Sequence, residues 1–579
     1  MVEARAFEMT REELIKLPTI PRGLEERIVL SSETARTFAR VGMLLNILSL
    51  QQAELLAREH RARRGLLEEV AVAAGLLTQE QVQQIIDAQA VEITVSAQHA
   101  ATGQFLTWVD EIRRLGVVPK ISRVSTQDLV TVKDARRAAP AKEEADLQTL
   151  AKVRTLILEA AGIGASDIHI RVREKYTEVL VRVKGDLFVV EKYSMESEEG
   201  DALVRSMYTG LATSKEGTFN PRQFQDGQIH GDALPGSGLS SVRIVRGPSY
   251  PEEAGCNFVV ARLQYLKSNG ERIALPKGVG LQLRTPKRPT GDVVLDGFND
   301  LQKELCDRLI RLPTGIVLVT GPTGSGKTTT LFNLMMRQAQ LFPHAAQMTI
   351  ENPPEYPQEW AIQLTSDGED FQARVRTALR SDPDIILLGE LRAAAEAIAA
   401  VQAAMTGHFV WSTVHVNDPY MVFSRFEGWD RTRLARSELA DADLISGLLA
   451  QRIVPILCDE CSVPLEDKAD AIPSYLGKII RTWGETHDVH VRGENKECEK
   501  CNGTGIFKTQ AVAEVVMTDE EFMEDVRREG VAKARRNYRK REGVDKSMLG
   551  NAMDLILAGC IDPNDAQRSV RLFEFAEGV

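Results

Sequence analysis

The chain has 579 residues, which exceeds the roughly 250–300 residues at which a single hydrophobic core stops growing, so we expect about three domains. Hydrophobic residues make up 43% of the sequence and charged residues 26%, which excludes a disordered or fibrous protein. The net charge of −11 argues against a broad phosphate-binding surface, so we expect no nucleic-acid partner.

The N-terminal region lacks the features of a targeting or membrane segment. Residues 1–18 are charged throughout and contain no apolar stretch of the kind found in secretory signals. No run of about 18 apolar residues occurs anywhere in the sequence. We therefore expect a cytoplasmic protein that spans no membrane.

Residues 1–131 predict an all-helical domain. Helical periodicity is present in Leu48–Arg61 and Thr78–Ala90. Similar short segments beginning at Arg40 and Arg64 precede these two helices. They indicate either a short internal repeat or two ordinary helices with similar caps.

The next part of the chain changes character twice. Residues 132–146 have mixed charge and few large apolar residues, which predicts a linker. Residues 147–285 then contain segments that alternate between apolar and polar residues, as half-buried strands do. These segments, which predict an α+β domain, are Asp167–Val172, Glu178–Val183 and Ser241–Val245.

A third domain is predicted at residues 286–579. A basic, proline-rich stretch around Arg284–Gly291 indicates a hinge in front of it. Beyond the hinge, apolar runs alternate with helical stretches, which is typical of a parallel sheet covered by helices. The runs are Ile316–Thr320, Met348–Ile350, Ile385–Leu388 and Phe409–Ser412.

The sequence GPTGSGKT at residues 321–328 follows an apolar strand and precedes a helix, which is the context of a P-loop, or Walker A motif. Its glycines let backbone amides approach phosphate oxygens, and the positive end of the helix adds to the anion site. We expect Lys327 to contact the β- and γ-phosphates of ATP and the Thr328 hydroxyl to ligate Mg²⁺. The predicted nucleotide-binding residues are Gly321, Pro322, Thr323, Gly324, Ser325, Gly326, Lys327, Thr328 and Thr329.

A second half of the pocket is predicted at the end of a later strand. Four consecutive apolar residues, Ile385–Leu388, are followed by Gly389 and Glu390. A buried strand would thus deliver the Glu390 carboxylate beside the P-loop, where it would order or polarise the attacking water. A core strand with solvated ends is the alternative.

Four of the seven cysteines form two C-x-x-C pairs, which in a reducing compartment indicate metal ligands before disulfides. Four thiolates suit a closed, structural Zn²⁺ site. Unrelated buried thiols and a redox dithiol are the alternatives, and the separation of the two pairs exceeds that of a compact zinc ribbon. The predicted zinc ligands are Cys458, Cys461, Cys498 and Cys501.

Taken in order, these motifs resemble the secretion ATPases that power type II secretion and type IV pilus assembly. The resemblance extends from about residue 150 to 579. Thr349–Tyr356 is similar to the family's Asp box and Thr406–Asp418 to its His box. Two positions depart from the pattern, since Asn352 and Ala393 stand where the family usually has Asp.

The resemblance implies a fold and an assembly. The fold is an α/β RecA-like P-loop core, preceded by an α+β domain of PAS-like type. The helical N-terminal domain predicted from periodicity lies outside the resemblance, and we expect it to bind a partner. A small zinc-binding subdomain is implied at residues 452–515, since Ala450–Arg452 and Thr504–Phe507 match the assembly and secretion branch. The assembly is a homohexameric ring.

The resemblance also implies roles for further residues. Glu351 would offer a carboxylate to the Mg²⁺ and water network, and the choice of general base between Glu351 and Glu390 stays open. His415 would sense the γ-phosphate, and His408 would support the loop. Three arginines of the preceding domain are candidates to reach the nucleotide: Arg243, Arg262 and, more weakly, Arg222.

The function implied is a motor, peripheral at the inner membrane, that couples Mg-ATP hydrolysis to the extrusion of pilin-like subunits through an inner-membrane platform protein. A DNA-translocating conjugation ATPase is an alternative that the acidic balance and the cysteine pairs disfavour. A nucleotide-binding regulator without turnover is another, which Asn352 and Ala393 make conceivable.

Overall fold

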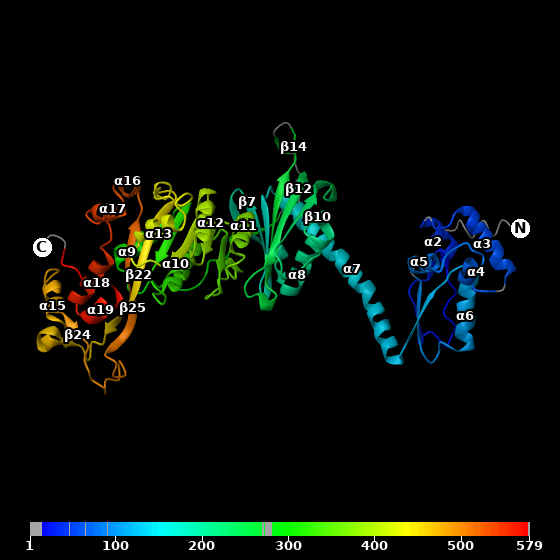
Figure 1. Cartoon of the computed structure of the whole chain (residues 1–579), viewed down its shortest axis with the longest axis horizontal. Helices are drawn as coiled ribbons and strands as arrows, with labels where there is room; N and C mark the ends of the chain where they lie inside the picture. The colour runs from blue at the N-terminus through cyan, green and yellow to red at the C-terminus, as the bar shows by residue number, and fades with distance from the viewer. Residues whose placement is uncertain are drawn as a thin grey trace. The chain divides into compact units, whose positions relative to one another are not determined.

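The computed structural model describes residues 14–576, apart from residues 46, 64, 90, 269–270, 273–280 and 572. The chain divides into two compact units, residues 1–148 and 149–579 (Figure 1). None of the helices within the described part of the chain combines the length and apolar character needed to cross a membrane.

The first unit contains a small mixed sheet. Strand β4 (Glu92–Ser96) lies at its centre, antiparallel to β2 (Ile28–Leu30) and parallel to β5 (Lys120–Val124). The all-helical prediction for residues 1–131 is therefore wrong within the described residues, which exclude residues 1–13. A five-residue strand leaves little periodic signal between two longer helices, and its burial by α6 (Gly103–Arg114) is a tertiary effect.

The two predicted helices of this unit are confirmed as α3 (Leu50–Ala62) and α5 (Gln79–Gln89). Each helix begins with a capping box, formed by Ser49 and Gln52 in α3 and by Thr78 and Gln81 in α5. In both pairs the side chain of each residue accepts a hydrogen bond from the backbone amide of the other. Each follows a seven-residue helix, a similarity that fits a short repeat, although Arg64 lies outside the described residues. The remaining elements are β1 (Ile15–Lys16), β3 (Thr34–Ala35), α2 (Phe38–Leu44) and α4 (Leu67–Ala73).

Helix α7 (Thr126–Gly162) runs through the segment predicted as a linker, residues 132–146. The segment is therefore helical and ends close to the boundary between the two units, and its role as a linker stays a prediction. The segment is rich in Ala, Glu, Lys and Arg, which are strong helix formers, so its low apolar content did not prevent a helix. At the C-terminal end of α7, Leu156 and Ile157 enter the core of the second unit.

The second unit begins with an antiparallel sheet in the order β10-β11-β12-β13-β6-β7-β8-β16, with β9 paired to β7. The predicted strands are confirmed, since they lie in β6 (Asp167–Val172), β7 (Tyr176–Val183) and β12 (Leu239–Pro248). One face packs on α7 and on α8 (Ser197–Ser206). The other strands are β8 (Asp186–Val190), β9 (Met195–Glu196), β10 (Ser214–Lys215), β11 (Gln225–His230), β13 (Asn257–Tyr265), β14 (Lys267–Ser268), β15 (Glu271–Arg272) and β16 (Leu283–Arg284).

The rest of the second unit is built on a seven-stranded sheet in the order β19-β18-β20-β21-β17-β22-β25, parallel except for β25. All four predicted apolar runs are strands of this sheet. Its strands are β17 (Gly315–Thr320), β18 (Gln347–Glu351), β19 (Ala361–Thr365), β20 (Ile385–Leu388), β21 (Phe409–Val414), β22 (Ile445–Leu457) and β25 (Ile506–Met517). A domain boundary near residue 285 stays a prediction, because the second unit is compact as a whole.

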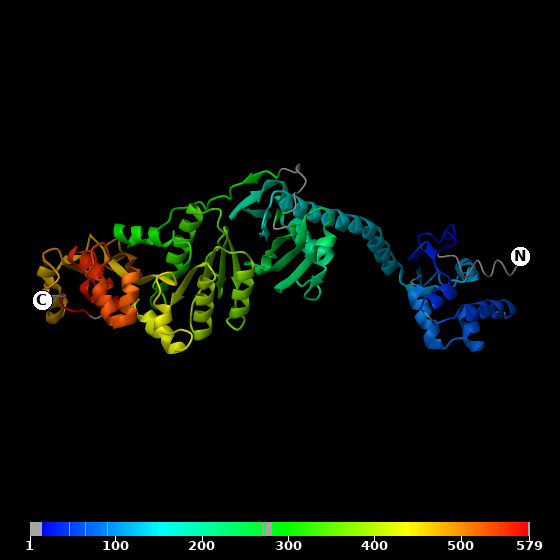
Figure 2. The same cartoon turned by 90° about the horizontal axis from the view of Figure 1, so that it is seen from above.

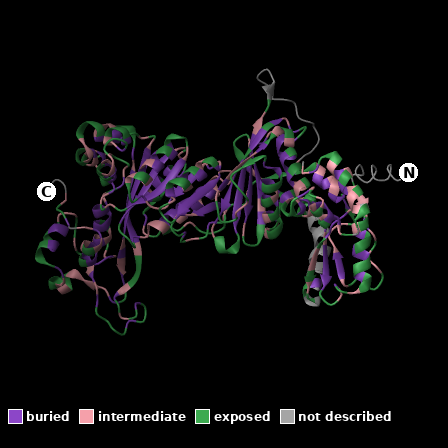
Figure 3. Cartoon of the chain, turned by 45° about the vertical axis from the view of Figure 1, so that its right-hand side comes forward, coloured by how far each residue is buried: buried purple, intermediate pink, exposed green. Residues whose placement is uncertain are grey.

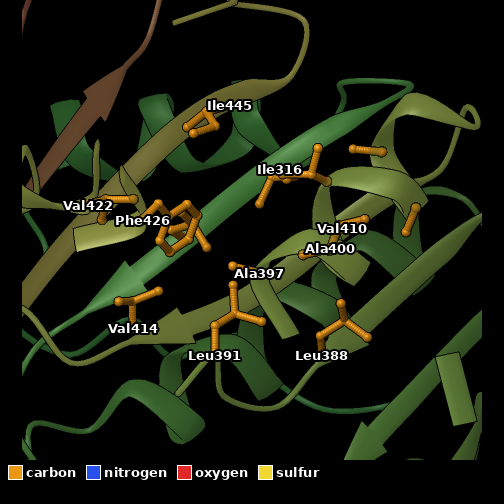
Figure 4. Close-up of a cluster of buried hydrophobic side chains, with 14 of the residues drawn as sticks. Ile316, Leu388, Leu391, Ala397, Ala400, Val410, Val414, Val422, Phe426 and Ile445 are labelled. Atoms are coloured by element: carbon orange, nitrogen blue, oxygen red, sulfur yellow. The ribbon is translucent and has the colours of Figure 1, made fainter. Parts of the chain in front are cut away.

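Helices cover both faces of the parallel sheet (Figure 2). Ile316 and Leu318 of β17 point to one face, under α11 (Phe371–Arg380) and α12 (Ala394–Met405), where Figure 4 shows the packed side chains. Alternate residues of β17 point to the other face, under α9 (Asp300–Leu309) and α10 (Lys327–Leu341). The central strands β17, β20 and β21 are buried along their whole length, the sheet is mostly purple in Figure 3, and burial on both faces explains their continuous apolar sequence.

Short elements complete the second unit around β22 and β25. They are α13 (Met421–Trp429), α14 (Arg436–Leu439), β23 (Val463–Pro464), α15 (Ser474–Ile480), β24 (His490–Val491), α16 (Glu520–Glu529), α17 (Val531–Tyr538), α18 (Met548–Leu557) and α19 (Pro563–Ser569).

Candidate nucleotide-binding site

The predicted P-loop connects β17 to α10, which begins at Lys327. A Cβ atom at Gly321 would lie 2.5 Å from the Ser325 hydroxyl oxygen and 2.7 Å from the Gln451 carbonyl oxygen, so only glycine fits there. Gly326 has a φ of 80° at the N-cap of α10, a conformation that favours glycine. The loop thus turns its backbone amides and the positive end of α10 toward one space.

The Lys327 side chain folds back over the loop. Its ammonium donates hydrogen bonds to the carbonyl oxygens of Gly321 and Pro322, at 3.0 and 2.9 Å. Burial lowers the pKa of Lys327, and the nearby Glu390 carboxylate opposes this effect. A partly desolvated cation with only neutral acceptors gains most from an anionic ligand.

A cavity of about 730 Å³ opens over the P-loop. Its volume lies in the range of small-molecule sites. The segments that follow β18, β20 and β21 meet here, because the carboxyl ends of parallel strands share one edge of the sheet. Predicted residues that line the cavity are Thr323, Gly324, Ser325, Gly326, Lys327, Thr328, Thr329, Glu351, Glu390 and His415.

Glu390 lies at the centre of a charged cluster in this cavity. Its Oε1 is 2.6 Å from Nε2 of His415, and its Oε2 is 2.8 Å from Nη2 of Arg392. On the other side of the His415 ring, Nδ1 lies 3.0 Å from the Gly321 carbonyl oxygen. His415 therefore connects the carboxylate to the P-loop, and both of its ring nitrogens face oxygen atoms.

Glu351 is the second carboxylate of the cavity. It lies at the end of β18, is 8% exposed and accepts a hydrogen bond of 3.3 Å from Gln363 Nε2. Burial raises the pKa of Glu351, against the effect of its hydrogen bonds. The site thus holds one enclosed carboxylate, Glu351, and one, Glu390, that is paired with Arg392 and contacts His415.

The two departures from the family pattern affect this cavity differently. Asn352 lines it directly after Glu351. Ala393 is the N-cap residue of α12 and has no side chain that could accept from the first amides of the helix, whereas the Glu396 carboxylate accepts from the Ala393 amide at 2.8 Å. The Ala393 departure therefore removes a helix cap and leaves the carboxylates of the cavity in place.

Several lining residues were not among the predicted site residues, and Arg392 and Tyr356 are two that contact predicted ones. Arg392 contacts Glu390, and its only sequence signal is its position two residues beyond that carboxylate. The Tyr356 hydroxyl lies 3.0 Å from the Thr329 hydroxyl, and its ring packs against Phe332. His408 instead contacts Ala403 and Thr406 in the turn before β21, and its supporting role stays a prediction.

The candidate arginines lie on the antiparallel sheet, outside this cavity. Arg243 of β12 and Arg262 of β13 are register partners, and both are exposed. Arg262 is held by Asp167 and Asp382, at 2.8 and 3.0 Å. Neither arginine, nor Arg222, is among the described residues that line the nucleotide cavity of the same chain.

Asp382 joins the two sheets of the second unit. The buried His169 contacts it at 3.1 Å, Arg182 pairs with it, and Arg182 Nη2 also lies 2.9 Å from Asp384 Oδ2. Burial lowers the pKa of His169, although Asp382 acts in the opposite direction. These contacts hold Asp382 and Asp384 in the turn just before β20, the strand that ends beside Glu390.

The four predicted zinc ligands meet in one buried cluster. Their Sγ atoms all lie within 4.8 Å of one another, with 3.7 Å between Cys458 and Cys498 and 3.5 Å between Cys461 and Cys501. Four thiolates bound to zinc at about 2.3 Å would be about 3.8 Å apart, so the cluster fits a tetrahedral site. The Gly505 amide also donates to Cys501 Sγ at 3.2 Å.

The wide spacing of the two cysteine pairs has a structural cause. Cys458 follows β22 and Cys501 precedes β25, and these two strands are antiparallel partners. The residues between the pairs form β23, α15 and β24, which pack into a hydrophobic core together with β22, β25, α18 and α19. They occupy a folded lobe where a compact zinc ribbon has a short loop.

Residues 142–568 match the family described as Type II/IV secretion system protein. The type II secretion system protein E of Aeromonas hydrophila is 30% identical over 420 residues, which cover 70% of this chain and 74% of that protein. The type IV pilus assembly ATPase PilB of Thermus thermophilus is 30% identical over 395 residues, or 67% of this chain and 40% of that protein. A relative from Pectobacterium carotovorum, also a type II secretion system protein E, is 33% identical, and the match spans 57% of its length.

Among solved structures, the pilus retraction motor PilT with bound ADP is 20% identical, with a TM-score of 0.35, and the match covers 72% of this chain and 96% of that one.

The family match extends over most of the chain and includes the P-loop, the cavity and the cysteine cluster. The chain therefore belongs to the Type II/IV secretion system protein family, the family of type II secretion and type IV pilus assembly ATPases.

Proposed function

We propose that this chain is an Mg-ATP-hydrolysing motor subunit that drives the assembly of pilin or pseudopilin subunits, in type IV pilus extension or type II secretion, through an inner-membrane platform protein. The observation that carries the proposal is the contact of Glu390 with His415 and Arg392 in the cavity that contains Lys327. Family membership supports ATP as the nucleotide. In this proposal the protein works peripherally at the cytoplasmic face of the inner membrane.

Hydrolysis here is a matter of position and electrostatics. Lys327 and the amides at the start of α10 hold the β- and γ-phosphates. Glu390 accepts a hydrogen bond from the attacking water, whose oxygen bonds to the γ-phosphorus as the bond to ADP breaks. Mg²⁺, for which Thr328 offers a hydroxyl ligand, supplies charge neutralisation when bound.

Phosphate release from Mg-ATP by the purified chain tests the proposal. Hydrolysis that does not depend on DNA is expected, given the net charge of −11. Stimulation by DNA would favour a conjugation-type translocase, and binding without phosphate release would favour a nucleotide-binding regulator.

We propose further that six copies form a closed ring in which the parallel sheet is a RecA-like core and the antiparallel sheet is a PAS-like domain. The position of the candidate arginines supports this arrangement, because neither Arg243 nor Arg262 lines the cavity of its own chain. An arginine presented by a neighbouring subunit would act on charge that develops at the γ-phosphate during transfer.

Replacing Arg243 with alanine is therefore expected to lower kcat by roughly 10²-fold or more while the Kd for ATP changes little. Arg262→Ala should also lower kcat, but it frees Asp167 and Asp382 as well, so Arg243 gives the clearer result. Arg205→Ala, an exposed arginine of α8, is the control. Light scattering with Mg-ATP tests the ring, and a monomer with full activity would contradict it.

We also propose that the cysteine cluster holds one structural Zn²⁺ per chain, since four buried thiolates complete its coordination without an open position. Elemental analysis of protein purified without chelators is expected to find about one zinc per chain. Cys458→Ser should reduce the zinc content and the melting temperature while ATP still binds. Cys560→Ser, which changes a half-buried thiol outside the cluster, should do neither. Zinc-free wild-type protein would refute the site.

A further inference from the structure

Strand β22 carries two polar residues in the middle of an otherwise apolar stretch, Ile445–Leu457. Gln451 is fully buried and Arg452 is 5% exposed. Burying an amide and a guanidinium costs free energy unless both find partners. Gln451 contacts Ser325, which lines the nucleotide cavity, and Arg452 contacts the segment just beyond His415, which also lines it. Neither Gln451 nor Arg452 is itself among the described residues that line that cavity.

Gln451 lies directly beneath the P-loop. Its Nε2 donates a hydrogen bond of 2.5 Å to the Ser325 carbonyl oxygen. Because that carbonyl can only accept, the amide nitrogen must be the atom that faces it. The same Nε2 lies 3.1 Å from the position of a Cβ on Gly326, and the Gln451 carbonyl oxygen lies 2.7 Å from that of Gly321. Gln451 therefore supports both ends of the loop.

Arg452 binds the segment that follows His415. Its Nη2 donates to the Asn417 carbonyl oxygen at 3.0 Å, and its Nη1 donates to the Gln451 carbonyl oxygen at 3.0 Å. Asn417 lies two residues beyond His415, which contacts both Glu390 and the P-loop. The P-loop, the His415 segment and β22 are thus linked in a closed circuit of contacts.

We propose that Gln451 and Arg452 are the positioning residues of the nucleotide site. Gln451 fixes the Ser325 peptide, so that the amides of the P-loop point at the phosphates. Arg452 fixes the His415 segment, so that Glu390 is aligned with the water. The inference rests on the proposed function, because it assumes that the P-loop binds ATP.

The two residues should therefore separate binding from turnover. Gln451→Met keeps the length of the side chain and removes the donor, so the Kd for a non-hydrolysable ATP analogue is expected to rise roughly tenfold, with kcat at saturating Mg-ATP within about threefold. Arg452→Lys keeps the charge but replaces two separated guanidinium nitrogens with one ammonium nitrogen, so it cannot hold the Gln451 and Asn417 carbonyls in the same geometry, and kcat is expected to fall roughly tenfold with little change in Kd.

The matched control is Gln302→Met. Gln302 is a buried glutamine of α9 that donates to the Ala513 carbonyl oxygen at 2.8 Å, away from the P-loop. This variant should lower the melting temperature without changing Kd or kcat. If the β22 residues served stability alone, their variants would behave like Gln302→Met, and the inference would be overturned.

Parallel titrations of the wild type and of Lys327→Ala separate this inference from the proposed function. A wild type that fails to bind the analogue refutes the function itself. A wild type that binds, beside a Gln451→Met protein of equal affinity, refutes only the inference. Should Gln451→Met fail to fold, Gln451→Asn keeps the amide but shortens its reach and is expected to weaken binding likewise, so unchanged affinity in that variant also overturns the inference.

Discussion

Replacing Lys327 with alanine is expected to remove ATP binding, with a Kd at least roughly 100-fold higher than that of the wild type. In the structure the ammonium is satisfied only by the Gly321 and Pro322 carbonyl oxygens. ATP would exchange these neutral acceptors for anionic phosphate oxygens, which attract the ammonium more strongly in a partly desolvated site. Each tenfold change in Kd corresponds to about 1.4 kcal/mol, so losing two such contacts accounts for the expected factor.

Titration calorimetry with ATP and Mg²⁺ measures the effect. Lys303→Ala is the control, because Lys303 is a half-exposed lysine of α9 near Asp300 and does not line the cavity. It should bind ATP like the wild type. A Lys327→Ala protein whose Kd stays within about threefold of the wild type would show that the phosphates do not lie on this loop.

The P-loop and the strands around it could be predicted because their physical requirements appear directly in the sequence. Gly321 is required by the close approach of Ser325 and Gln451, and Gly326 by its positive φ. The apolar run from Ile316 to Thr320 is required by burial of the strand on both faces. The cysteine cluster was predictable for a similar reason, since two C-x-x-C pairs indicate four metal ligands whatever the fold of the residues between them.

Features that depend on tertiary contacts could not be predicted in the same way. Strand β4 is too short to show a period and is defined by its two neighbours. Residues 132–146 are polar enough for a linker, yet their helix-forming residues continue α7. The only sequence signal for Gln451 is that it is a polar residue in a largely apolar strand. Its contact with the P-loop could not be predicted, because it depends on β22 lying next to β17.

The pairing of Glu390 with His415 depends likewise on strand register. Strands β20 and β21 are parallel, with Leu388 opposite Ser412, and the Leu391 amide donates to the Thr413 carbonyl oxygen at 2.9 Å beyond the end of β20. This register brings the residues after both strands to the same height above the P-loop. Sequence motifs supplied the two residues, but their contact follows from the order of strands in the sheet.

Replacing Glu390 with glutamine is expected to lower kcat by roughly 10²–10³-fold while the Kd for ATP stays within about threefold. Glutamine has the same shape, and its carboxamide oxygen can still accept from Arg392 or His415, so the cavity should keep its form. It lacks the negative charge that would draw a proton from the attacking water. Stopped-flow binding and steady-state phosphate release separate the two effects.

Glu351→Gln provides the comparison that decides between the two carboxylates. Glu351 is enclosed, with its pKa raised by burial, and it contacts Gln363, whereas Glu390 lies between Arg392 and His415 and is linked through His415 to the P-loop. If Glu390 orders the water, Glu351→Gln should lose less turnover than Glu390→Gln. A larger loss in Glu351→Gln would assign the base to Glu351 and leave Glu390 to hold His415 against the P-loop.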